Sequence, residues 1–199
     1  MPLPLEKQNL AKRQKLLECS KDLFIEKGYS NTSTRDIIDR SGFGTGTFYN
    51  YFIDKEDVLR GLLEGFSHQI IADISSFYSD EPNLYERFIE TKRITMEIFA
   101  KEEALSEIYC RANDVSDSIN DCIRSFESKL IDFFANNIAF GINQGAFNQV
   151  EVLPVANAIL AMEKYLLYRW IVTKDISKHE MIDMVISFHK TLALGLVKQ

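Results

Sequence analysis

A short polar segment from Thr45 to Phe52 carries hydrogen-bonding side chains in a pattern suited to molecular recognition. Threonine, tyrosine and asparagine surround one strongly apolar pair, Phe48 and Phe52. Hydroxyls and amides on an otherwise exposed short helix suit DNA phosphates and base edges better than they suit a core. With neighbouring positions included, the candidate DNA-binding residues are Ser33, Thr34, Arg35, Thr45, Gly46, Thr47, Tyr49, Tyr51 and Lys55.

These candidates divide by the contact that each side chain can make. Ser33 and Thr34 would begin a helix, where exposed N–H groups and hydroxyls can hold a phosphate. Arg35 can donate two hydrogen bonds to a guanine edge, and Gly46 would let the backbone approach the duplex closely. Lys55 is the expected phosphate anchor. The alternative is structural: the serine is only a cap, the arginine a surface charge and the tyrosines half-buried packing.

Two short helices and a turn must position these residues. Ser33 is expected to cap the first short helix, with Asp36 completing a capping box, and Gly42 should end it. The second short helix runs from about Thr45 to Phe52, and Asp54 caps the helix that follows. Helix, tight turn and helix in this order place a helix end in the DNA major groove.

Residues 13 to 59 resemble the N-terminal DNA-binding domain of the TetR family of bacterial transcriptional repressors. The matching positions are Phe24, Gly28-Tyr29, Thr32-Ser33, Asp36-Ile37, Gly42, Gly46-Thr47-Phe48-Tyr49, Tyr51-Phe52 and Lys55-Glu56. Gly44 and Thr45 depart from the Ser and Lys that are common in the family, which removes a cation from the recognition helix. The resemblance implies a ligand-responsive homodimeric repressor that binds a palindromic operator and is released by a small-molecule inducer.

The rest of the chain shows helical periodicity and no persistent strand alternation, so the expected fold is all-α. We expect a helix-turn-helix DNA-binding domain at 1–54 and a helical ligand-binding and dimerisation domain at 55–199. Pro82 and Pro154 are expected to open helices, and the second of these should reach Val172. A long helix should span about 117–143. Ser177 and Glu180 form a capping box for the last helix.

Aromatic residues gather between positions 84 and 138, where apolar pockets between helices are natural small-molecule sites. A small apolar or amphipathic inducer is therefore expected there, in contact with Phe88, Phe99, Tyr109, Phe126 and Phe133. The alternative is that these aromatic side chains simply fill the core.

The last two helices are the expected dimer interface because the final one is apolar on more than one face. Two such pairs would form a four-helix interface with isologous contacts. The alternative is that both helices are core of one protomer. The predicted interface residues are Ile159, Glu163, Leu166, Trp170, Met181, Val185, Phe188 and Leu192.

Charge and composition restrict the remaining classes of function. The net charge is −6, but residues 1–53 carry eight Lys/Arg and six Asp/Glu, a balance of +2, which leaves −8 for the remainder. A locally basic face can bind phosphate although the whole protein is acidic. No signal peptide or membrane span is visible, so we expect a cytoplasmic protein.

Catalytic chemistry finds little support in the sequence. The three histidines, His68, His179 and His189, are far apart, and the three cysteines have no metal-binding spacing. No catalytic residue, metal or cofactor is therefore expected. Two alternatives stay open: a helical small-molecule-binding protein or enzyme with a vestigial DNA-binding domain, and a DNA binder or activator without an inducer.

Overall fold

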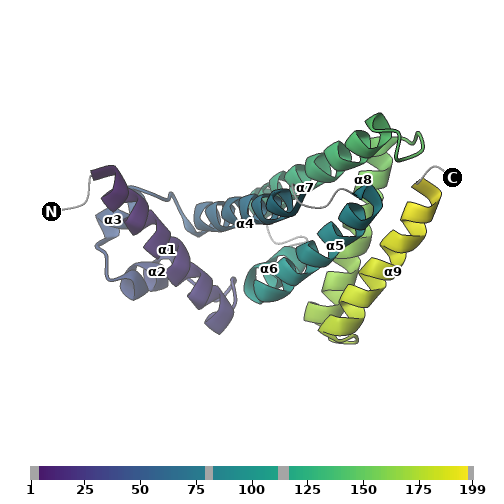
Figure 1. Cartoon of the computed structure of the whole chain (residues 1–199). Coiled ribbons are helices and arrows are strands. Elements are labelled where there is room, and N and C mark those ends of the chain that lie inside the picture. Colours follow the sequence, from purple (N-terminus) through teal and green to yellow (C-terminus); the bar gives the residue numbers. More distant parts are fainter. Residues whose placement is uncertain (1–4, 79–82, 112–116, 197–199) are drawn as a thin grey trace. The chain divides into compact units, whose positions relative to one another are not determined.

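A computed structural model describes residues 5–78, 83–111 and 117–196, and every regular element among them is helical (Figure 1). The prediction of an all-α fold is confirmed. In chain order the elements are α1 (Leu5–Lys27), α2 (Thr34–Ser41), α3 (Thr45–Tyr49), α4 (Lys55–Tyr78), α5 (Leu84–Lys101), α6 (Glu103–Arg111), α7 (Asp117–Asn143), α8 (Val152–Tyr168), the π-helical segment η1 (Arg169–Thr173) and α9 (Lys178–Leu196).

The chain forms two compact units, Met1–Gly65 and Phe66–Gln199, and the division falls within α4. The domain boundary expected from the sequence, after residue 54, lies at the start of the same helix. Among the described residues, no helix is both long and apolar enough to cross a membrane.

Local sequence signals shape the first unit. The backbone of Gly28 follows α1 with a φ of 80°, and Gly42 ends α2 in the left-handed region with a φ of 72°. Ser33 and Asp36 form the predicted capping box. Asp54 accepts a hydrogen bond from the backbone N–H of Asp57 at 2.8 Å, as expected of a helix cap. Buried apolar side chains from all four helices fill the core, among them Leu16, Leu23, Ile37, Phe48 and Leu59.

The second unit is a helical bundle in which α5 packs on α9 and α7 packs on α8 (Figure 1). At the end of α7, the backbone at Gly141 and the ring of Phe147 are in close contact. The Phe147 ring lies where a side chain at Gly141 would begin, since a Cβ there would be 2.2 Å from the ring. Only glycine leaves room for this aromatic side chain, which also packs edge-on against Phe88.

Several predicted helix bounds differ from the structure, and one of them is the end of α3, which lies at Tyr49 rather than near Phe52. The long helix spans Asp117–Asn143, and Ser177 and Glu180 cap α9 as predicted. Pro82 lies outside the described residues, and α5 begins only at Leu84, because the Asn83 side chain accepts the first free N–H groups. The helix expected to begin at Pro154 starts two residues earlier and passes into η1, which nothing in the sequence indicated.

Candidate nucleic-acid interface and ligand-binding region

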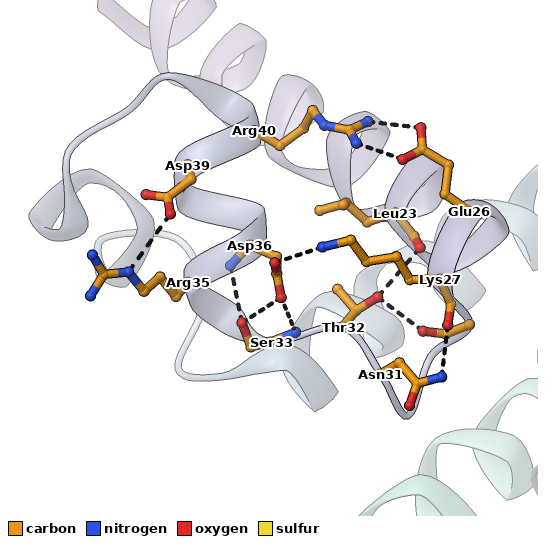
Figure 2. Close-up of polar contacts among 11 residues, drawn as sticks. Leu23, Glu26, Lys27, Asn31, Thr32, Ser33, Arg35, Asp36, Asp39 and Arg40 are labelled. Carbon is orange, nitrogen blue, oxygen red and sulfur yellow. Dashed lines mark hydrogen bonds and ion pairs between the residues drawn. The ribbon is translucent and has the colours of Figure 1, made fainter.

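Ser33 is the N-cap residue of α2. Its hydroxyl donates to an Asp36 carboxylate oxygen at 2.6 Å and accepts from the Asp36 N–H at 3.1 Å (Figure 2). Lys27 donates to the other Asp36 oxygen at 2.8 Å. Hydrogen bonds from Lys27 and Ser33 hold the pKa of Asp36 well below its usual range. The Ser33 side chain therefore acts as a helix cap in the free protein, as the structural alternative proposed.

Arg35 is the more exposed of the two arginines on α2. Its side chain is 89% exposed and meets only Asp39, at 3.7 Å, among the ion pairs of the described chain. Figure 2 shows both on the side of α2 opposite the contacts to α1. On the α1 side, Arg40 donates to both carboxylate oxygens of Glu26, at 3.0 and 2.6 Å. Arg40 thus connects α2 to α1, while Arg35 projects toward solvent.

Helix α3 is one short segment anchored by a single aromatic side chain. Phe48 is fully buried and packs against Phe52. On the opposite side Tyr49 is 57% exposed, and Thr45 and Gly46 are exposed as well. A Cβ placed on Gly46 would meet no atom within 4 Å. Thr34 and Thr47 are half-buried, and Asn50, which was not among the predicted contacts, is exposed beside Tyr49.

Tyr51 and Lys55 have partners inside the first unit. The Tyr51 hydroxyl donates to Asn9 on α1 at 3.1 Å. The Lys55 ammonium donates to the Tyr29 carbonyl at 2.8 Å and lies 4.2 Å from the centre of the Tyr29 ring. Partial burial lowers the pKa of Lys55. Both side chains therefore connect the segment after α3 to α1 and to the turn that follows α1. The sequence did not indicate this role because the partners are distant in the chain.

The five aromatic residues predicted to contact a ligand separate into two groups. Phe99, Tyr109 and Phe126 pack against one another, with ring centres 5.0 to 6.3 Å apart. The Tyr109 hydroxyl donates to Glu127 at 3.2 Å, and burial raises the pKa of Tyr109. These three rings are well-packed core, which is the alternative interpretation.

Phe88 and Phe133 line a small cavity in the second unit. About 10 Å³ of it is accessible to the centre of a water molecule, which is about the space that one water needs. The other lining residues are Ile74, Thr91, Lys92, Phe134, Asn137 and Ile159. A neighbouring cavity shares Phe88 and Asn137 and is otherwise lined by Leu84, Arg87, Phe140, Gly141 and Phe147.

Most of the predicted dimer stripe faces the interior of its own chain. Five of the eight residues are buried within the protomer, namely Ile159, Glu163, Leu166, Met181 and Val185. Trp170 and Leu192 are half-buried, and Phe188 is exposed. The buried side of α9 packs on α5 and α8. The large apolar side chains that α8 and α9 expose are Leu153, Tyr165, Tyr168, Met184 and Phe188.

Comparison with known proteins places the chain among bacterial regulators. Residues 16–62 match the family model of the tetR family of bacterial regulatory proteins. A crystal structure from Syntrophomonas wolfei, assigned to the TetR family of transcriptional regulators, is 60% identical with a TM-score of 0.90, and the match covers 95% of this chain and 98% of that one.

Two further similarities are weaker, one in coverage and one in identity. The transcriptional repressor KstR2 of Mycobacterium tuberculosis is 34% identical over 77 residues, which are 39% of this chain and only 38% of the repressor. The regulator FadR of Bacillus subtilis, crystallised with stearoyl-CoA, is 16% identical with a TM-score of 0.79 over 92% of this chain and 98% of that one. At that identity the likeness shows the fold alone.

Proposed function

Because this chain belongs to the TetR family of helix-turn-helix transcriptional regulators, we propose that it is a homodimeric repressor that binds a palindromic operator and is released by a small-molecule inducer. The observation that carries the DNA-binding part is the exposed polar surface of α2 and α3, held on a frame of capped and cross-braced helices. A rigid frame with free donors at its surface suits DNA recognition, since base contacts demand fixed geometry.

The proposed DNA contacts come from residues that α2 and α3 leave exposed. Arg35 reads base edges, and Thr45, Gly46 and Tyr49 meet the backbone or the bases from the exposed side of α3. The remaining candidates, Ser33, Thr34, Thr47, Tyr51 and Lys55, support this surface through caps, packing and contacts to α1 and Tyr29. We therefore expect substitutions of these five residues to weaken DNA binding partly by destabilising the fold of the first unit.

The proposed homodimer uses the exposed apolar surface of α8 and α9 rather than the buried stripe. Tyr165 and Tyr168 on α8 and Met184 and Phe188 on α9 are between 37% and 61% exposed. By the helical repeat, each pair lies on one face of its helix. Exposed apolar surface of this kind marks an interaction site, and an isologous contact buries the same surface of both copies. A two-fold dimer also presents two recognition helices to half-sites about 34–36 Å apart.

The proposed inducer enters the second unit beside Phe88 and Phe133, where the two cavities lie. A ligand shifts the regulator toward release only if it binds the DNA-free arrangement more tightly than the DNA-bound one. The FadR complex with stearoyl-CoA supports this choice to the extent that another protein of this fold holds an amphipathic ligand with an apolar acyl chain.

Selection of DNA sites from a random pool tests the proposal directly, because recovery of a palindrome supports both operator binding and two-fold geometry. The recovered site should bind at least about 10³-fold more tightly than random duplex at the same salt. Equal affinity for the two would contradict the proposal and favour a helical binding protein with a vestigial DNA-binding domain.

A paired charge insertion tests the dimer. Met184→Glu with Phe188→Glu should convert a dimer into a monomer in sedimentation and abolish operator binding together. Lys190→Glu is the matched control, since this exposed position lies on another side of α9 by the helical repeat. A wild-type monomer at micromolar concentration would contradict both the interface and the palindromic operator.

A further inference from the structure

Three ionisable side chains from three helices meet in the interior of the second unit. Lys92 on α5, Glu163 on α8 and His189 on α9 are 3%, 1% and 0% exposed. The Lys92 ammonium lies 3.1 Å from Glu163 Oε1, and His189 Nε2 lies 3.3 Å from the same oxygen. The ammonium also lies 3.2 Å from the centre of the Phe134 ring. The cluster therefore joins α5 to the two helices that bear the proposed dimer surface.

Hydrogen bonding in the cluster is incomplete. His189 Nδ1 is 2.7 Å from the Val185 carbonyl, so this nitrogen donates and Nε2 of the neutral ring is an acceptor. Burial and the nearby Lys92 lower the pKa of His189 to about 3, which keeps the ring neutral. Within the described chain, neither the Lys92 ammonium nor either Glu163 oxygen makes a hydrogen bond of good geometry. Lys92 thus has donors to offer to another acceptor.

Stability alone explains such a cluster poorly. Buried ion pairs can often be replaced by apolar residues of similar volume without loss of stability, because desolvation offsets the attraction between the charges. Desolvation by burial lowers the pKa of Lys92 and raises that of Glu163, so both charges are disfavoured by their surroundings. The cluster calls for a role beyond filling the core.

Lys92 is the member of the cluster that lines the cavity beside Phe88 and Phe133, whereas Glu163 and His189 are not among the lining residues. The adjoining cavity is lined by Arg87 and shares Asn137. No acidic side chain is among the residues that line either cavity. The walls are otherwise largely aromatic and aliphatic. A molecule entering here would meet mainly apolar surface, with Lys92 in the wall of one cavity and Arg87 in the wall of the other.

We propose that the effector is an amphipathic organic carboxylate, whose carboxylate group binds Lys92 and whose apolar body lies along Phe88, Phe133 and Phe134. This inference rests on the proposed function of a ligand-released regulator and names the chemical class of its ligand. The present space holds about one water molecule, so binding must enlarge it. Phe88 and Asn137 line both cavities, so a ligand that needs more space has the second cavity next to the first.

Competition between the ligand and Glu163 for Lys92 links ligand binding to DNA affinity. A ligand carboxylate takes the ammonium that Glu163 now faces, which leaves the buried Glu163 carboxylate without its counter-charge. The present packing of α5 against α9 and its Lys92 contact to α8 are then disfavoured, and α8 and α9 bear the surface proposed to set the dimer. The ligand therefore favours a different arrangement of the two protomers.

Three probes with the same ten-carbon chain test the charge preference: decanoate, decanol and decyltrimethylammonium. Calorimetric titration of the full-length protein should show decanoate binding at least 10-fold more tightly than the other two. Carboxylates from six to sixteen carbons are titrated in parallel to find the best chain length. Equal affinity for decanoate and decanol, or no binding by any carboxylate of the series, would overturn the inference.

Variants assign the preference to Lys92. Lys92→Met removes the ammonium but leaves Glu163 buried alone, so Lys92→Met with Glu163→Gln is made as well, to remove both charges. The double variant should stay folded by circular dichroism and bind decanoate and decanol within about 3-fold of each other. Lys101→Met is the matched control, because it makes the same change at an exposed position of α5, and it should keep the wild-type preference.

Operator affinity measured with and without decanoate separates this inference from the proposed function. If the double variant loses the preference for decanoate, the site is supported. If, at the same time, decanoate leaves the operator affinity of the wild-type protein unchanged, ligand-driven release is contradicted. A double variant that retains the preference for decanoate would overturn the site, and operator binding by the ligand-free protein would still stand.

Discussion

Gly46 offers the sharpest test of the DNA-binding surface, because the free protein gives no reason for a glycine there. Its φ is not positive, it is exposed on α3, and an added Cβ would meet nothing within 4 Å. Alanine is favoured over glycine in a helix by up to about 1 kcal/mol. Gly46→Ala should therefore leave the stability of the protein unchanged or raise it by up to about 1 kcal/mol.

Operator binding should respond in the opposite direction. If the α3 backbone lies directly against a phosphate, the new methyl group keeps that contact from closing. A hydrogen bond to a charged group contributes about 1.5–3 kcal/mol, so its loss weakens operator binding by about 10- to 150-fold for each protomer. A variant that is more stable and binds DNA less well would separate recognition from folding.

Fluorescence anisotropy with the selected operator and with random duplex, both at one salt concentration, measures the binding, and urea unfolding measures the stability. Gly65→Ala is the matched control, since this glycine is also helical, exposed and open around its Cβ but lies outside α3. Wild-type operator affinity in a folded Gly46→Ala protein would refute the close approach. A loss of stability would refute the reasoning about open space.

Other substitutions test the fold and the surface separately. Gly141→Ala should destabilise the protein by about 1–3 kcal/mol in urea unfolding despite its better helix propensity, because the Cβ would lie 2.2 Å from the Phe147 ring; equal or greater stability would show that the ring moves freely. Hydrogen bonds depress the pKa of Asp36, so its contribution to stability is complete above the ordinary pKa near 3.9 and is lost as pH falls toward the depressed value. Asp36→Asn should thus be less stable than wild type at pH 7 and differ less at pH 3, and a gap that does not narrow in acid would contradict this role. Arg35→Ala should leave unfolding unchanged and relax base preference at one or two operator positions, at a cost of about 1–3 kcal/mol in binding. Lys55→Ala should instead lower stability by about 1 kcal/mol through the lost hydrogen bond, and unaltered unfolding would leave this lysine free to act on phosphate as first expected.

The bounds of α2 and the start of α4 were predictable because their causes are local, whereas α3 ends at Tyr49 rather than near Phe52. The capping box of Ser33 and Asp36 spans three residues, and Gly42 adopts the left-handed conformation that ends α2. A hydrogen bond between near neighbours in the chain depends little on the rest of the fold. The capping box of Ser177 and Glu180 predicted the start of α9 in the same way. The family resemblance of residues 13 to 59 was visible for a related reason, since its motif is continuous in the chain.

Tertiary structure alone decided which face of each apolar helix is buried and which charges meet. The last helix is apolar on more than one side, so periodicity could not tell that Met181 and Val185 face the core while Met184 and Phe188 face solvent. Lys55 finds its carbonyl partner 26 residues away, at Tyr29. Lys92, Glu163 and His189 come from three helices. Contacts between distant segments depend on how whole helices pack, and composition and spacing within each segment do not contain that information.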